Sequence, residues 1–98
     1  MIIFISGPIT GTPDYKRNFN RVENGLLVRG HTVLNPAKAL TGLTNEKALP
    51  VCLAMINAAD AVLFLPDWDY SAGATLEHDY CGYIGKPIYY DLEEVPNQ

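Results

Sequence analysis

The sequence predicts a small α/β domain with a four-stranded parallel sheet in the order 2-1-3-4 and helices on both faces of that sheet. Three features predict this fold. Short apolar runs alternate with longer segments of helical period, the runs lack the polar alternation of half-exposed strands, and turn residues mark the boundaries. Because crossovers between parallel strands are right-handed, few topologies remain, and we expect a three-layer, flavodoxin-like or Rossmann-like arrangement.

The first strand is predicted at residues 2–5, which are all apolar and typical of a strand buried on both faces. A loop rich in turn residues follows at 6–13. Asp14 can then cap a helix that runs to about residue 29, and Gly30 can end it.

The second strand is predicted at residues 31–34, and residues 37–44 should form a loop or a short helical turn. Asn45 can cap a helix over 46–59. The regular part of this helix should begin at Pro50, because proline is tolerated in a first turn but not in a helix interior.

The third strand is predicted at residues 61–65, another uninterrupted apolar run. A loop at 66–70 leads to Ser71, which can cap a helix that ends at Gly85. The fourth strand is predicted at residues 87–90.

The chain has 98 residues and a mass of 10.8 kDa, which is enough for one domain. Its 48% apolar and 18% charged content is typical of a globular protein and excludes the disordered, collagen-like and coiled-coil classes. We expect a single domain over residues 1–92, followed by a polar tail at 93–98.

The net charge is −4, and it is unevenly distributed. Residues 1–49 hold six Lys or Arg and three Asp or Glu, whereas residues 50–98 hold one and eight. A surface that is acidic on average argues against nucleic acid as a partner, because nucleic-acid binding needs a basic stripe. The basic residues of the first predicted helix are more typical of a solvated face than of an anion site; they are Lys16, Arg17, Arg21 and Arg29.

Cys52 and Cys81 form neither a disulfide framework nor a metal-binding pattern. We therefore expect reduced core thiols in a cytoplasmic protein that uses no metal and no cofactor. The apolar run at the N-terminus is too short for a membrane span and lacks the basic lead of a signal peptide, so we expect no membrane partner.

In open parallel sheets, ligands bind beyond the carboxyl ends of the strands, where the strand order reverses. Here that place lies between strands 1 and 3, so the loops at 6–13 and 66–71 should carry the chemistry. The first loop has neither a dinucleotide fingerprint nor a P-loop. Gly7 and Gly11 can expose backbone N–H groups to an anion, or can simply form a tight turn.

The second loop leads into the start of the third long helix. Ser71 offers a hydroxyl and free N–H groups, which suit a phosphate. Glu77 lies six residues later, and because helical side chains lean toward the N-terminus it should lie above Gly73 and Ala74. Such a carboxylate above small residues leaves room for a substrate; alternatively, the small residues only allow close packing and Glu77 is exposed.

Other residues of the same region have two interpretations each. Trp68 can stack on a nucleobase or seal the loop onto the core. Asp67 and Asp69 can protonate a leaving base or activate water, or can be solvated loop carboxylates. His31 and His78 are interpreted as structural, because one begins a strand at the wrong edge and the other points around its helix from the carboxylate.

Five segments of the chain form a pattern: Ser6-Gly-Pro-Ile-Thr-Gly11, Gly30-His-Thr-Val-Leu-Asn-Pro36, Ala59-Asp-Ala-Val-Leu-Phe-Leu-Pro66, Ser71-Ala-Gly-Ala-Thr-Leu-Glu77 and Gly85-Lys-Pro87. Together they resemble the nucleoside 2-deoxyribosyltransferase-like superfamily, and most closely its small DUF4406-type domains and its 5′-deoxynucleotide N-hydrolases. The resemblance covers nearly the whole chain, and the stretch from Trp68 to Glu77 is its most specific part.

The resemblance implies a reaction on nucleotides or nucleosides. Members of the superfamily cleave the N-glycosidic bond of deoxyribonucleosides or of their 5′-monophosphates: a glutamate attacks C1′, and water or a second base then accepts the sugar. Glu77 matches that glutamate, and Ser71 matches the phosphate-binding serine of the hydrolases. The expected catalytic residues are Glu77 and Asp69, and the expected substrate-binding residues are Ser6, Gly7, Pro8, Ile9, Trp68, Ser71 and Gly73.

Two positions depart from the superfamily pattern. Thr10 stands where the hydrolases tend to have arginine, and Arg17 replaces that charge only if the fold brings it there. Cys52 stands where active members carry an aspartate that orients the sugar and the nucleophile. The open alternatives are therefore cleavage of a nucleotide, nucleotide binding and sequestration without turnover, and a purely structural role.

We also expect a homodimer or a higher homo-oligomer. The predicted site has little to cover a nucleotide, and the chain has more tyrosines than a four-stranded sheet can bury. Related enzymes complete their sites with residues of a neighbouring subunit. A two-fold contact should run through Tyr80 and Tyr83, on the helix that carries Glu77.

Overall fold

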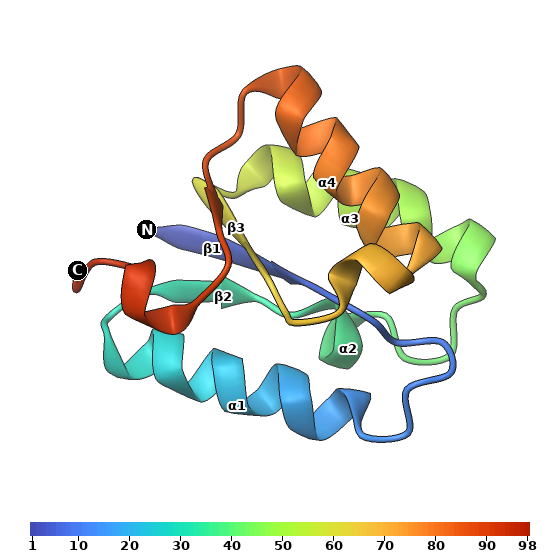
Figure 1. Ribbon diagram of the computed structural model, residues 1–98, viewed down its shortest axis with the longest axis horizontal. Helices are drawn as coiled ribbons and strands as arrows, with labels where there is room; N and C mark the ends of the chain where they lie inside the picture. Colours follow the sequence, from blue (N-terminus) through green and yellow to red (C-terminus); the bar gives the residue numbers. More distant parts are fainter.

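The computed structural model describes residues 1–98 and contains one four-stranded parallel sheet between helical layers (Figure 1). The strands are β1 (Ile2–Ser6), β2 (Thr32–Leu34), β3 (Ala61–Phe64) and β4 (Ile88–Tyr89). The helices are α1 (Tyr15–Val28), α2 (Pro36–Ala39), α3 (Asn45–Ala58) and α4 (Ala72–Ile84), and single 3-10 turns lie at Trp68–Tyr70 and Leu92–Glu94. The order β2-β1-β3-β4 confirms the predicted topology. None of the helices is both long and apolar enough to cross a bilayer.

The side chains of β1 alternate between two apolar layers, one on each face of the sheet. Ile3 and Ile5 pack toward α1, where Phe19 is also fully buried. Phe4 packs on the opposite face, with Phe64 of β3 and with residues of α3 and α4. Figure 1 shows the same layers, with α1 on one side of the sheet and α3 and α4 on the other. Because helices cover both faces, the strands are apolar throughout rather than alternating.

The register brings the carboxyl ends of β1 and β3 side by side. Ser6, the last residue of β1, is paired with Phe64, the last residue of β3. The backbone N–H of Leu65 then donates to the Ser6 carbonyl oxygen at 2.8 Å. The loops after these two strands therefore leave the sheet together, at the edge where parallel sheets bind ligands.

Three details of the predicted helices need correction. Thr44 rather than Asn45 caps α3, because its hydroxyl oxygen accepts a backbone N–H of the first turn at 3.3 Å and Asn45 is already helical. The helix also runs through Pro50 without interruption, so its regular part begins earlier than predicted. Asp14 precedes α1 as expected, but its side chain makes no capping hydrogen bond.

The predicted polar tail, residues 93–98, packs against the domain instead. Val95 is only 4% exposed and belongs to the apolar layer under α1. The Gln98 N–H donates to the Arg29 carbonyl oxygen at 2.8 Å, and His31 Nε2 donates to the Pro96 carbonyl oxygen at 2.6 Å. The sequence pattern did not predict this contact, because two glutamates precede the one buried valine. His31, which binds the Pro96 carbonyl oxygen, has the structural role expected of it.

Candidate active site

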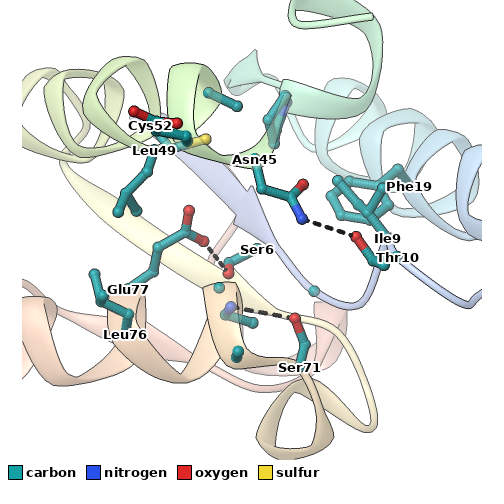
Figure 2. A pocket seen from close by; sticks show the side chains of 17 residues that line it. Ser6, Ile9, Thr10, Phe19, Asn45, Leu49, Cys52, Ser71, Leu76 and Glu77 are labelled. Atoms are coloured by element: carbon teal, nitrogen blue, oxygen red, sulfur yellow. Dashed lines mark hydrogen bonds between the residues drawn. The ribbon is translucent and has the colours of Figure 1, made fainter. Parts of the chain in front are cut away.

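A cavity of about 390 Å³ opens at the carboxyl edge of the sheet (Figure 2). It lies between the loop after β1, the first two turns of α3 and the first two turns of α4. We call it the first cavity; its volume is within the range of small-molecule sites. Much of the wall is apolar, and the polar or charged side chains in it are Ser6, Thr10, Asn45, Glu46, Ser71 and Glu77.

Glu77 is the buried carboxyl group of this cavity. The residue is only 8% exposed, so the alternative in which it points to solvent does not hold. Ser6 Oγ donates a hydrogen bond to Glu77 Oε1 at 2.6 Å, which joins α4 to the end of β1. Figure 2 shows the carboxyl group projecting from α4 into the space between Ser6 and the Cys52 side chain of α3. Three elements that are distant in the sequence therefore surround one carboxyl group.

Burial also determines the protonation of this group and of its neighbours. Burial raises the pKa of Glu77 above its usual value, and the Ser6 hydroxyl and the Cys52 thiol offset this effect only in part. Burial, followed by the charge of Glu77, raises the pKa of Cys52 to about 12 and that of Cys81 to about 11. Both cysteines therefore remain neutral thiols at neutral pH, and no Lys or Arg forms an ion pair with Glu77.

The start of α4 forms the floor of the first cavity. Ser71 caps the helix as predicted, because its Oγ accepts the Ala74 N–H at 3.3 Å. The N–H groups of Ala72 and Gly73 have no acceptor in the protein. A Cβ on Gly73 would meet no atom within 4 Å, so packing against the sheet does not require glycine there. This side of the cavity therefore has free space beside Gly73, and the N–H groups of Ala72 and Gly73 are available to a ligand.

The loop after β1 combines a tight path with free backbone donors. A Cβ on Gly7 would lie 2.8 Å from the Leu65 Cβ, so only glycine lets the loop pass this close to the end of β3. Gly11 has a φ of +75°, in the region that favours glycine. The N–H groups of Gly7, Ile9, Thr10 and Gly11 donate to no acceptor in the protein. The two interpretations of these glycines are therefore compatible: the loop makes a tight turn that requires glycine, and its backbone N–H groups are free.

The structure brings most of the predicted site residues together, but not all of them. Those that line the first cavity are Ser6, Gly7, Ile9, Ser71, Gly73 and Glu77. Pro8 lines an adjacent cavity instead. Asp69 is exposed and lines neither cavity, so it is not beside Glu77.

Trp68 also lies outside both cavities. Its ring stacks on His78 with 4.0 Å between ring centroids, and it tilts against Phe64 at 5.5 Å. The His78 Nε2 atom lies 2.7 Å from the Tyr90 hydroxyl oxygen. In this structure Trp68 thus packs its loop onto the core, and His78 supports that packing on the side of α4 away from Glu77.

The resemblance implied a site position at Cys52, but Asn45 and Leu49 of the same helix were not among the predicted site residues. Asn45, Leu49 and Cys52 form one wall, and Asn45 Nδ2 donates to Thr10 Oγ1 at 3.3 Å (Figure 2). A sequence signal for this wall exists, because residues 48–59 contain no charged side chain. A helix without a charged face is normally covered on more than one side or lines a cavity.

Comparisons with known proteins agree with this architecture. The model of a family described as "Domain of unknown function (DUF4406)" matches residues 1–90. A 2-deoxyribosyltransferase from the psychrotolerant bacterium Bacillus psychrosaccharolyticus is similar with a TM-score of 0.75 and 18% identity, over 100% of this chain and 92% of that chain. A 2-deoxyribosyltransferase from Leishmania mexicana is similar with a TM-score of 0.70 and 22% identity, over 89% of this chain and 61% of that chain. No curated protein matches by sequence, and at these identities the structural likeness establishes a shared fold.

Replacing Glu77 by Gln should stabilise the protein at neutral pH. Because the pKa of Glu77 is raised in the native state, stability falls as pH rises from 4.5, the reference value, through the raised value. Glutamine keeps an acceptor for Ser6 without a charge. We expect a melting temperature several degrees higher at neutral pH, since 1 kcal/mol corresponds to roughly 4–8 °C in a domain of this size. The gain should disappear below pH 4.5.

Thermal unfolding of both proteins across a pH series measures this effect. Glu46→Gln is the matched control, because Glu46 lines the same cavity but is exposed. A gain for Glu77→Gln that is equally large at acid pH would show that the buried charge is not its cause.

Proposed function

The chain belongs to the DUF4406 family, and we propose that it cleaves the N-glycosidic bond of a (deoxy)nucleoside 5′-monophosphate, by hydrolysis or by deoxyribosyl transfer. The observation that carries the proposal is the buried carboxyl group of Glu77, held by Ser6 in the wall of a cavity of small-molecule size. The fold supports it, since two proteins of the same fold are 2-deoxyribosyltransferases.

In the proposed reaction, the Glu77 carboxylate attacks C1′ of the sugar and the bond from C1′ to the base nitrogen breaks. The base leaves with the bonding electrons, and the sugar remains as an ester of Glu77 until water or a second base accepts it. The hydrogen bond from Ser6 orients the carboxylate. The apolar wall strengthens the attraction between this carboxylate and the positive charge that develops on the sugar. Asp69 lies outside the cavity, and the proposal gives it no role.

Cys52 affects how readily Glu77 ionises. Its pKa of about 12 keeps the thiol neutral, so it adds no negative charge beside the carboxylate. A second carboxylate at this position would raise the pKa of Glu77 further. Compared with the aspartate that the resemblance implies at this position, the Cys52 thiol offers a weaker polar contact to the sugar. It also leaves Glu77 easier to ionise.

The 5′-phosphate is assigned to the region of Ser71 and the loop after β1. Ser71 offers its hydroxyl at the start of α4, where the N–H groups of Ala72 and Gly73 are free. The free N–H groups of Gly7 and Ile9 come from the other side of the same cavity. Unpaired N–H groups at a helix start and in a loop favour an anion.

The second candidate function is nucleotide binding without turnover. The observation that favours it is Cys52, a neutral thiol at the position where the resemblance implies an aspartate that acts on the sugar. The same cavity would then hold an intact nucleotide against Glu77.

Base release from a panel of deoxynucleoside 5′-monophosphates and free nucleosides, followed by chromatography, tests the proposed reaction. Glu77→Ala and Glu77→Gln should each lower the rate by roughly three orders of magnitude or more, because both remove the nucleophile. The rate of the unmutated protein should rise with pH across a range above 4.5, since the nucleophile must be ionised and its pKa is raised. Unchanged base release in Glu77→Ala would refute the role of Glu77; a nucleotide bound intact and never cleaved would favour the second function.

Two variants of Ser71 test the phosphate assignment as a matched pair. Asp and Asn both cap helices well, so Ser71→Asp and Ser71→Asn should retain the fold and differ mainly in one negative charge. We expect the unmutated protein to prefer nucleotides over nucleosides, Ser71→Asn to keep part of that preference and Ser71→Asp to erase or reverse it. Equal turnover of nucleotide and nucleoside by the unmutated protein would refute the assignment.

We also propose that the protein forms a homodimer through α4. Tyr83 is 90% exposed on this helix, whereas Tyr80 is half-buried and donates its hydroxyl to Asn57 Oδ1 at 2.8 Å. Light scattering at micromolar concentration should give twice the chain mass of 10.8 kDa, and Tyr83→Glu should give the monomer. Tyr70→Glu is the control, because Tyr70 is 86% exposed but precedes α4. A monomeric unmutated protein would contradict the proposal.

A further inference from the structure

A second cavity adjoins the first at the carboxyl edge of the sheet. It has a volume of about 610 Å³ and lies between the loop after β1, the second turn of α1 and the loop after β3. Thr10 and Ser71 line both cavities, so the two meet at these side chains. We propose that the phosphate of the ligand lies at this junction, beside Ser71, and that Arg21 binds it from the second cavity. The inference rests on the proposed function, because the base and sugar would occupy the first cavity.

The first cavity cannot by itself balance the charge of a phosphate. No Lys or Arg lines it, whereas the carboxyl groups of Glu46 and Glu77 do. A phosphate held entirely in the first cavity would therefore face two carboxyl groups and no cation. Its favourable position is at Ser71, on the side that faces the second cavity.

Arg21 is the one cation among the residues that line the second cavity. It forms no ion pair, because the two ion pairs of the structure join Arg17 to Asp14 and Lys38 to Glu23. Arg17 lines neither cavity, so the fold does not bring it to the place of the missing family arginine. Arg21 lies one turn further along α1 and can bind a phosphate with two parallel N–H donors.

The other groups of the second cavity suit a single phosphate. Asn18 precedes Arg21 by three residues and shares its face of α1, and the N–H groups of Thr10 and Gly11 have no acceptor in the protein. Asp67 lines the same cavity, and its carboxylate repels a ligand that carries several negative charges. One arginine against one aspartate therefore favours a monophosphate over a diphosphate or triphosphate.

Calorimetry in a Glu77→Gln background separates binding from turnover. The ligands are the 5′-monophosphates of the four common deoxynucleosides and the corresponding free nucleosides. Arg21→Gln should weaken binding of the monophosphate about tenfold, the usual effect of losing a hydrogen-bonded charge, and leave nucleoside binding unchanged. The tenfold difference should shrink as salt increases, because Arg21 is exposed.

Two further variants serve as controls of opposite kind. Arg17→Gln removes an equal charge from the same helix but outside both cavities, and it should leave binding of the monophosphate unchanged. Asp67→Asn should tighten binding of the monophosphate several-fold, and asparagine tolerates the φ of +66° at this position. Melting curves of each variant establish that it is folded.

The outcomes distinguish this inference from the function on which it rests. If monophosphates bind more tightly than nucleosides but Arg21→Gln changes neither, the role of Arg21 is refuted and the proposed function stands. Equal losses in Arg17→Gln and Arg21→Gln would also refute it, since they would show only a general effect of charge. If no nucleotide binds either to the Glu77→Gln background or to the protein without any substitution, the proposed function fails and this inference fails with it.

Discussion

The organisation of the site depends on one buried carboxyl group without a neighbouring cation. Glu77 is 8% exposed, and the side chains that face its carboxyl group are neutral: the Ser6 hydroxyl, which donates a hydrogen bond to it, and the Cys52 thiol. Such a group destabilises the folded chain at neutral pH, because burial disfavours the ionised form. A chain selected only for stability would have an apolar or amide side chain at this position. A buried carboxyl group whose ionisation lowers the stability of the fold is typical of functional sites.

The parallel sheet is what makes this arrangement possible. Since β1 and β3 are neighbours and run in the same direction, Ser6 and the start of α4 arrive at the same edge. The start of α4 adds free N–H groups to that edge, and the loop after β1 adds more. The fold therefore places a carboxyl group and a set of unpaired donors within one small region, which suits a ligand with an electrophilic carbon and an anionic group.

The two cavities differ in the chemistry of the side chains that line them. The first has apolar walls from α1, α3 and α4 around the carboxyl group, and it contains no basic residue. The second is lined by a larger share of polar side chains, and Arg21 is among them. Ser71 stands at the boundary and also caps α4, so the residue that stabilises the helix is the same one that can contact a phosphate. The aromatic contacts of Trp68 and His78 lie outside both cavities and secure the loop that carries this boundary.

Much of the fold, and the part of the site that lies within one helix, followed from the sequence alone. Uninterrupted apolar runs predicted the strands, right-handed crossovers left few orders for them, and the helical period placed Glu77 above Gly73 and Ala74. The apolar runs and the helical period are reliable signals because each depends on residues close together in the chain, and the crossover rule then limits how the strands can be ordered. The tertiary structure alone decided that Asn45 lines the first cavity, that Asp69 does not, and that Arg21 rather than Arg17 lines the second. Those facts depend on how each helix is rotated and packed against the sheet, which is set by contacts between distant segments that no local pattern records.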